Sequence, residues 1–83
     1  MTLENRTSIT VGEPNWAPLE HVLPPEERMD FMYMGRVGEI ELYKHRWTRR
    51  YLNIGSDCRS FYLYTDGKYV EVERSVALDH VRN

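Results

Sequence analysis

The chain has 83 residues, of which 41% are apolar and 29% charged, a composition typical of a folded globular protein and unlike that of a disordered one. Its length predicts a single domain over residues 1–83 with a thin core. The net charge of −2 argues against a dedicated nucleic-acid-binding domain, since such domains are usually basic. Only one cysteine is present, and no apolar run is long enough for a signal peptide or a membrane span, so we expect a cytoplasmic protein.

The first third of the chain holds all four prolines and is expected to differ from the rest. Residues 1–7 are polar and predicted to be disordered, and residues 8–11 could add a short edge strand. Residues 14–30 read as a proline-rich helical segment in which Asn15 can act as the N-cap. The helix would bury an apolar stripe at helical spacing, formed by Trp16, Leu19, Val22 and Leu23.

Residues 31–73 change to a period of two, with glycine-containing turns between the apolar runs. This pattern predicts five strands, at residues 31–36, 39–45, 49–54, 60–65 and 68–73. The connections are so short that the strands should form an antiparallel meander, which can curl toward a small open barrel. A short helix over residues 75–82 ends the chain. The predicted fold class is therefore α+β, with a short N-terminal helix, a five-stranded antiparallel β-meander and a short C-terminal helix.

The turns predict the register of this sheet. Asp66-Gly67 is a preferred two-residue hairpin turn, a second such turn is expected at Val37-Gly38, and an odd-numbered loop at residues 46–48. Together they predict an aliphatic core face made of Tyr33, Ile40, Leu42, Leu52, Ile54, Phe61, Leu63, Val70 and Val72. They also predict a single row across the opposite face, made of Met32, Tyr43, Tyr51, Tyr64 and Tyr69.

Two arrangements of the helices remain open at this point. Each helix could cover one face of the sheet, in which case the tyrosines are packed beneath a helix. Alternatively, both helices could cover the core face, which would leave the tyrosines exposed as a binding surface. Tyrosine suits such a surface because it combines a large, stiff apolar ring with a polar tip.

The segment "YKHRWTRRY", residues 43–51, carries four positive charges and no acid, whereas residues 1–42 carry eight acids and three bases. It is predicted to be a hairpin tip bearing Trp47, with Lys44 and Arg50 opposite each other on the core-face side. Because like charges that face each other are unfavourable, a negative group should lie nearby. The candidates are Glu20, Glu26, Glu27 or Asp30, a helix C-terminus, or an external anion.

No pattern of catalytic or metal-binding residues stands out. His21, His45, His80 and Cys58 lie on separate elements without the paired spacing of a metal site, so we expect no metal and no cofactor. Glu39 and Glu41 read as solvated strand positions. Cys58 has no histidine near it in sequence to act as a base, which leaves a thiol-dependent or hydrolytic enzyme as a distant alternative.

These features predict a small non-enzymatic interaction or regulatory module. It would bind another protein, or a second copy of itself, through the tyrosine-lined face and the basic tip, and it would not bind a membrane. The alternative is nucleic-acid binding, with arginines on phosphates and bases stacked on aromatic rings. The predicted binding residues are Met32, Tyr43, Lys44, Arg46, Trp47, Arg49, Arg50, Tyr51, Tyr64 and Tyr69.

Overall fold

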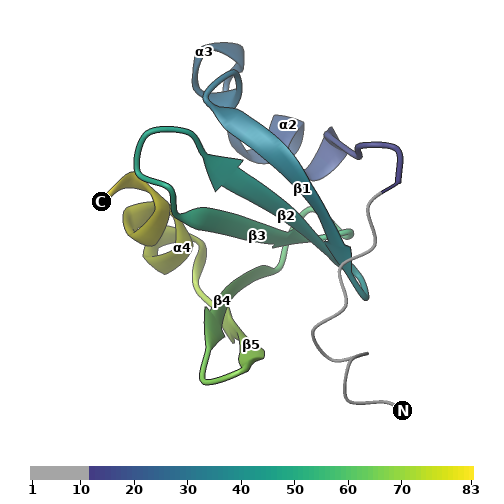
Figure 1. Ribbon diagram of the computed structural model, residues 1–83, viewed down its shortest axis with the longest axis vertical. Helices are drawn as coiled ribbons and strands as arrows, with labels where there is room; N and C mark the ends of the chain where they lie inside the picture. Colours follow the sequence, from purple (N-terminus) through teal and green to yellow (C-terminus); the bar gives the residue numbers. More distant parts are fainter. Residues whose placement is uncertain (1–11) are drawn as a thin grey trace.

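The computed structural model describes residues 12–83 and has the predicted α+β architecture, five antiparallel strands between short helices (Figure 1). The expectations for residues 1–7 and 8–11 lie outside the described residues. In chain order the elements are α2 (Ala17–Val22), α3 (Pro25–Arg28), β1 (Phe31–Val37), β2 (Ile40–His45), β3 (Tyr51–Gly55), β4 (Phe61–Thr65), β5 (Lys68–Val72) and α4 (Arg74–Arg82).

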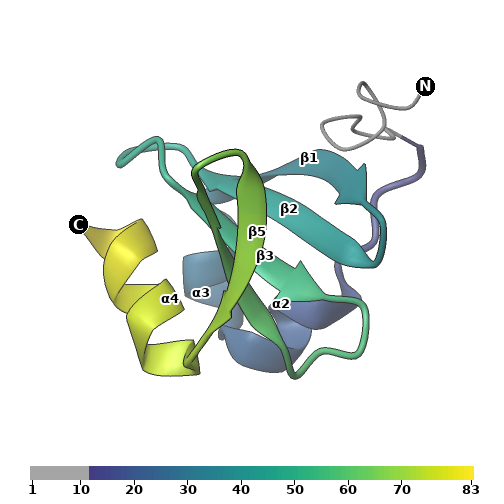
Figure 2. The same ribbon diagram turned by 90° about the horizontal axis from the view of Figure 1, so that it is seen from below.

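The sheet is a meander with the order β1-β2-β3-β4-β5, so each strand pairs with its neighbours in sequence. Within residues 12–83 no pairing joins β5 to β1, and the sheet therefore stays open and does not close into a barrel. It twists strongly, and the β4–β5 hairpin runs steeply across the direction of β1 and β2 (Figure 2).

Helix α2 forms where the prolines predict, but its N-cap is Trp16, one residue later than the predicted Asn15. The Asn15 side-chain oxygen accepts a hydrogen bond from the Ala17 amide at 3.3 Å, and Pro18 sits in the first turn, where no amide donor is needed. Pro24 and Pro25 then end the helix and open the single turn of α3. The predicted apolar stripe is confirmed, since Leu19, Val22 and Leu23 are all buried.

Both terminal helices cover the same face of the sheet (Figure 2). Leu19, Val22 and Leu23 from the α2 region and Ala77 and Val81 from α4 form one cluster with residues of β1 to β4. The strand members of this cluster are Phe31, Tyr43, Leu52, Ile54 and Phe61. The second of the two helix arrangements is thus the correct one, and the opposite face has no helix from residues 12–83 over it.

The register of the β4–β5 hairpin is confirmed. Tyr64 pairs with Tyr69, and Phe61 pairs with Val72. Asp66 and Gly67 have φ angles of 52° and 80°, the left-handed conformations that a tight hairpin turn of this type requires.

The predicted register between β1 and β2 is wrong. The turn lies at Gly38 and Glu39, one residue later than expected, so that Val37 pairs with Ile40. A bulge then shifts the pairing at Gly35, whose φ of 113° is a conformation that favours glycine.

The predicted register between β2 and β3 is also wrong, by one residue. Tyr43 pairs with Leu52, and Lys44 pairs with Tyr51. The loop between these strands has four residues because Arg49 adopts a φ of 68° and lets Arg50 pair with His45. A shift of one residue exchanges the two faces of a strand. Tyr43 and Glu41 therefore face the helices, whereas Ile40 and Leu42 face the other way, where Leu42 is still buried as predicted.

Candidate functional site

The face opposite the helices carries a row of side chains close to the predicted one, with Lys44 in the place of Tyr43. Lys44 pairs with Met32 on one side and with Tyr51 on the other, and Tyr64 pairs with Tyr69. Tyr51 and Tyr64 share a face because each lies two residues from the Asn53–Tyr62 pair. We call these five residues, Met32, Lys44, Tyr51, Tyr64 and Tyr69, the tyrosine row.

Neighbouring side chains of the tyrosine row contact each other, and Tyr64 and Met32 are exposed. Tyr64 and Tyr69 lie with their ring centroids 4.8 Å apart, and the Lys44 ammonium lies 5.9 Å from the centre of the Tyr51 ring. Burial, followed by the neighbouring Tyr64 and Tyr51, raises the pKa of Tyr69. Tyr64 is 51% exposed and Met32 is 45% exposed. The row thus offers apolar contact area held in place by its own side chains.

Tyr43 does not belong to this surface, contrary to the prediction. It is fully buried and packs against Trp16, with ring centroids 5.8 Å apart. Its hydroxyl donates a hydrogen bond to the Asn15 carbonyl at 2.6 Å, and burial raises its pKa well above the ordinary value. Tyr43 therefore holds α2 against the sheet and is out of reach of a partner.

The basic tip, residues 44–50, extends from the Lys44 end of the tyrosine row. Its loop is ordered around His45, whose Nδ1 accepts hydrogen bonds from the Trp47 and Thr48 amides, each at 3.2 Å. The His45 amide donates to the Arg50 carbonyl, and the Arg49 amide donates to the His45 carbonyl, both at 2.9 Å.

Two neighbouring elements hold this loop against the body of the domain. The Arg46 amide donates to the Asp30 carbonyl at 2.9 Å, and the Thr48 hydroxyl donates to the Val81 carbonyl at 2.6 Å. The His45 ring also meets the edge of the Phe31 ring, with centroids 5.0 Å apart. The tip is therefore fixed between the start of β1 and the end of α4.

The cationic side chains of the tip have no acidic partner among residues 12–83. The ion pairs there join Arg36 to Glu41 and Arg82 to Glu27, and none involves Lys44, Arg46, Arg49 or Arg50. The expectation that Glu20, Glu26, Glu27 or Asp30 neutralises the tip is thus wrong, because Glu27 pairs with Arg82 and Asp30 contributes a main-chain carbonyl. Lys44 also lies opposite Tyr51, whereas Arg50 was expected there.

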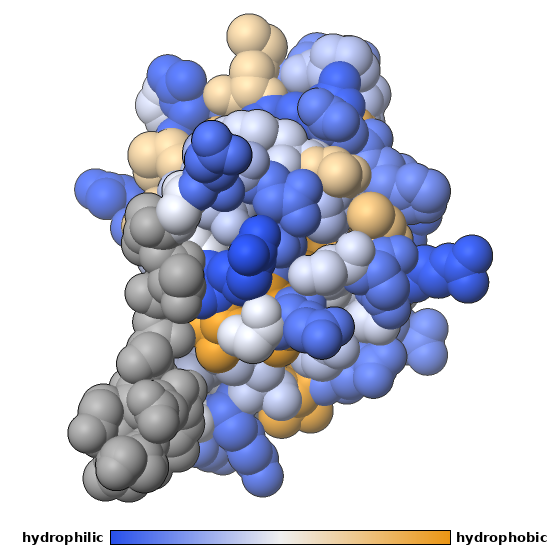
Figure 3. All heavy atoms as spheres, turned by 90° about the vertical axis from the view of Figure 1, so that its right-hand side faces the viewer, coloured by the Kyte–Doolittle hydropathy of each residue, from blue (hydrophilic) through white to orange (hydrophobic). Residues whose placement is uncertain are grey.

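Trp47 is the most exposed aromatic side chain of the tip, at 69%. The Arg46 guanidinium lies over its ring, 4.9 Å from the centroid, which keeps both groups together at the surface. The side of the molecule in Figure 3 is mostly polar, with apolar side chains visible only in small separate areas. The exposed Trp47 ring offers a partner a large aromatic contact at the tip.

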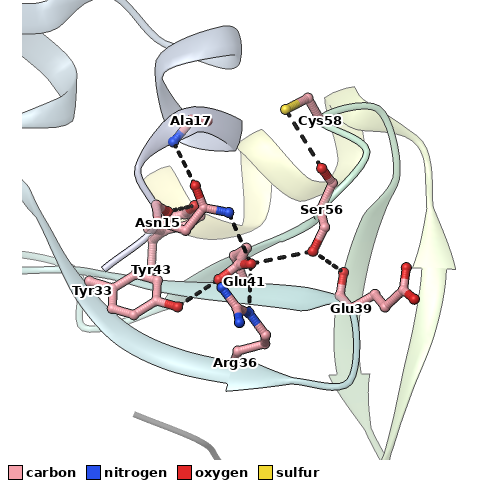
Figure 4. Close-up of polar contacts among 9 residues, drawn as sticks. All are labelled: Asn15, Ala17, Tyr33, Arg36, Glu39, Glu41, Tyr43, Ser56 and Cys58. Atoms are coloured by element: carbon pink, nitrogen blue, oxygen red, sulfur yellow. Dashed lines mark hydrogen bonds and ion pairs between the residues drawn. The ribbon is translucent and has the colours of Figure 1, made fainter. Parts of the chain in front are cut away.

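A buried carboxylate forms a second polar cluster, which the sequence did not predict (Figure 4). Glu41 is fully buried, although its position in the strand pattern suggested a solvated side chain. Its Oε1 accepts a hydrogen bond from the Tyr33 hydroxyl at 2.6 Å. Its Oε2 accepts from Arg36 Nε at 2.8 Å, from the side-chain Nδ2 of Asn15 at 3.1 Å and from the Ser56 hydroxyl at 3.3 Å.

Burial alone would raise the pKa of Glu41, but the hydrogen bonds from Tyr33, Asn15 and Arg36, together with the Arg36 charge, lower it overall. The carboxylate is thus held ionised, and it joins the segment before α2, strand β1 and the β3–β4 loop. Both of its oxygens accept hydrogen bonds from the protein, which is the arrangement expected of a structural ion pair.

The remaining candidate for chemistry, Cys58, lies in the β3–β4 loop with a φ of 65°. Its Sγ donates to the Ser56 carbonyl at 3.9 Å, and no histidine among residues 12–83 hydrogen-bonds to it. In the same part of the chain, no group of three or more histidine, cysteine, aspartate or glutamate side chains could hold a metal ion. We therefore take the tyrosine row and the basic tip as the candidate site.

Comparison with protein-family models, curated proteins and solved structures finds no match for this chain. Its function must therefore be inferred from the surface that the fold presents. Across residues 12–83, no helix has the length and apolar character needed to cross a bilayer.

Proposed function

We propose that this protein is a small non-enzymatic interaction module that docks on another protein through the tyrosine row and Trp47. The observation that carries the proposal is that α2 and α4 both pack on the opposite face, so that no helix of residues 12–83 covers the row. We also propose a cytoplasmic location, on the basis of the single Cys58 thiol.

The composition of this surface supports a protein partner. Tyrosine, tryptophan, methionine and arginine are enriched at protein interfaces, and tyrosine, tryptophan and arginine most often contribute the largest share of the binding energy. Here Tyr64, Tyr69 and Met32 belong to the tyrosine row, and Arg46 and Trp47 contact each other on the basic tip. The row lies on strands and therefore loses little conformational freedom when a partner binds.

The test is affinity capture under native conditions with two variants that carry the same substitution. Met32→Glu places a charge in the tyrosine row, whereas Met29→Glu places one on an equally apolar side chain that is 71% exposed beside α3. We expect a stoichiometric partner to be retained by the wild type and by Met29→Glu but lost, by at least tenfold, from Met32→Glu.

Light scattering of the purified wild type tests the same surface for self-association. A dimer that Met32→Glu dissociates would identify the partner as a second copy of the chain. Equal retention of every bound protein by both variants, together with a monomeric wild type, would refute the proposal.

A further inference from the structure

The backbone of the basic tip is ordered before any partner arrives. Five of its amides, those of His45, Arg46, Trp47, Thr48 and Arg49, donate hydrogen bonds to groups of residues 12–83. The Arg50 amide lies 3.3 Å from the Thr48 hydroxyl, which itself donates to the last turn of α4. The loop therefore needs little reorganisation on binding, which favours affinity.

The charges of this ordered loop are not matched within the described part of the chain. Asp30, whose carbonyl accepts from the Arg46 amide, forms no ion pair with the loop, Glu27 pairs with Arg82 at 3.2 Å, and Glu41 pairs with Arg36 at 2.8 Å. A loop with an ordered backbone, four cationic side chains and no ion pair to residues 12–83 is complementary to an anionic ligand. Arginine adds specificity because its planar fork matches a carboxylate with two parallel hydrogen bonds.

The loop also contains a backbone conformation, at Arg49, that is energetically unfavourable for arginine. Arg49 has a φ of 68°, in the left-handed region where glycine is preferred. Glycine at this position would close the same turn without the guanidinium. The side chain held by this backbone is exposed, so its guanidinium is accessible to a ligand at the tip.

The acidity of the rest of the chain favours a short anionic segment over a long polyanion. Outside residues 43–51 the chain carries thirteen acids and seven bases, so a long polyanion that tracks across the surface would be repelled. A short acidic segment can contact the basic tip without contacting the acidic surface around it. The tyrosine row that joins the tip at Lys44 suits the apolar side chains of such a segment.

We infer that the basic tip is a preformed receptor for the carboxylates of an acidic segment on the partner protein. The inference rests on the proposed function, because it assigns the chemistry of the segment that docks on the tyrosine row. Arg46, Arg49 and Arg50 would bind its Asp or Glu side chains. Lys44 would contact the segment where the tyrosine row meets the basic tip.

The experiment measures fluorescence anisotropy with two labelled probes, a short peptide of glutamate and leucine and a short oligothymidylate. The tip variant is Arg49→Gly with Arg50→Gln, which removes two charges and keeps the turn. Arg59→Gln is the matched control, since Arg59 is an exposed arginine on the β3–β4 loop, away from the tip. We expect the wild type and the control to bind the peptide, and the tip variant to bind it at least tenfold more weakly.

Three results would overturn the inference. They are no peptide binding at low salt, equal binding by the tip variant, and tighter binding of oligothymidylate with the steep salt dependence of phosphate contacts. The last result would identify the tip as a nucleic-acid site. If Met32→Glu loses a captured partner while the tip variant keeps it, the proposed function stands and only this inference fails.

Discussion

Replacing Glu41 with glutamine tests whether the buried carboxylate holds the fold together. Glutamine keeps the size of the side chain but removes its charge, so the three donors at Oε2, from Arg36, Asn15 and Ser56, would face a neutral acceptor. A hydrogen bond to a charged group contributes about 1.5–3 kcal/mol and a neutral one about 0.5–1.5, a difference of about 1 kcal/mol per bond. The three bonds together predict a loss of about 3 kcal/mol in the free energy of unfolding.

The assay is urea unfolding followed by tryptophan fluorescence, which reports on Trp16 because its ring packs against the buried Tyr43. A loss of about 3 kcal/mol is a large part of the 5–15 kcal/mol typical of small domains. The matched control is Glu39→Gln, at an exposed glutamate two residues away, and it should cost less than about 0.5 kcal/mol. Equal stability of the two variants would show that the hydrogen bonds to Glu41 do not stabilise the fold.

The same variant changes how stability depends on pH. The pKa of Glu41 is lower in the folded protein than in the unfolded chain, so its ionised form stabilises the fold above the unfolded value of about 4.3. That contribution is lost as the pH falls through the folded pKa. Below about pH 4.3 the wild type should therefore lose stability more steeply than Glu41→Gln. If the free energies of unfolding of the wild type and Glu41→Gln fall in parallel as the solution is acidified, this reasoning is wrong.

Three further substitutions test other parts of the structure by the same unfolding assay. Arg49→Gly should raise stability by up to about 1 kcal/mol, because it relieves the left-handed backbone, and a loss would show that the arginine side chain supports the loop. Leu52→Ala should cost about 2–5 kcal/mol at its fully buried position, and a change below about 1 kcal/mol would contradict its central place in the core. Tyr43→Phe should cost about 1–2 kcal/mol, since it leaves the Asn15 carbonyl without the hydroxyl donor, and no effect would mean that water replaces it.

The sequence predicted the parts of this fold that local chemistry determines. Asp66 and Gly67 specify their turn, and the β4–β5 register follows from it. The prolines bound α2, and the strands appear within a residue or two of the expected ranges. The row of exposed tyrosines was also predicted except for Tyr43.

The parts that failed depend on backbone conformations and long-range contacts that residue patterns do not encode. A left-handed arginine at position 49 and a bulge at Gly35 each shift the register, and no pattern of side chains indicates either one. The alternation in β2 suggested that Ile40 and Leu42 face the core. The structure buries Glu41 and Tyr43 there because donors and acceptors from distant segments satisfy their polar atoms.

The strict neighbour-to-neighbour order of the strands has a consequence for folding kinetics. Each hairpin closes a short loop, and proteins rich in such local contacts fold fast. The bonds from Asn15 to Glu41, from Thr48 to Val81 and from Arg74 to Val22 span 26, 33 and 52 residues. We expect the sheet to assemble first and these three bonds to lock the terminal helices onto it afterwards.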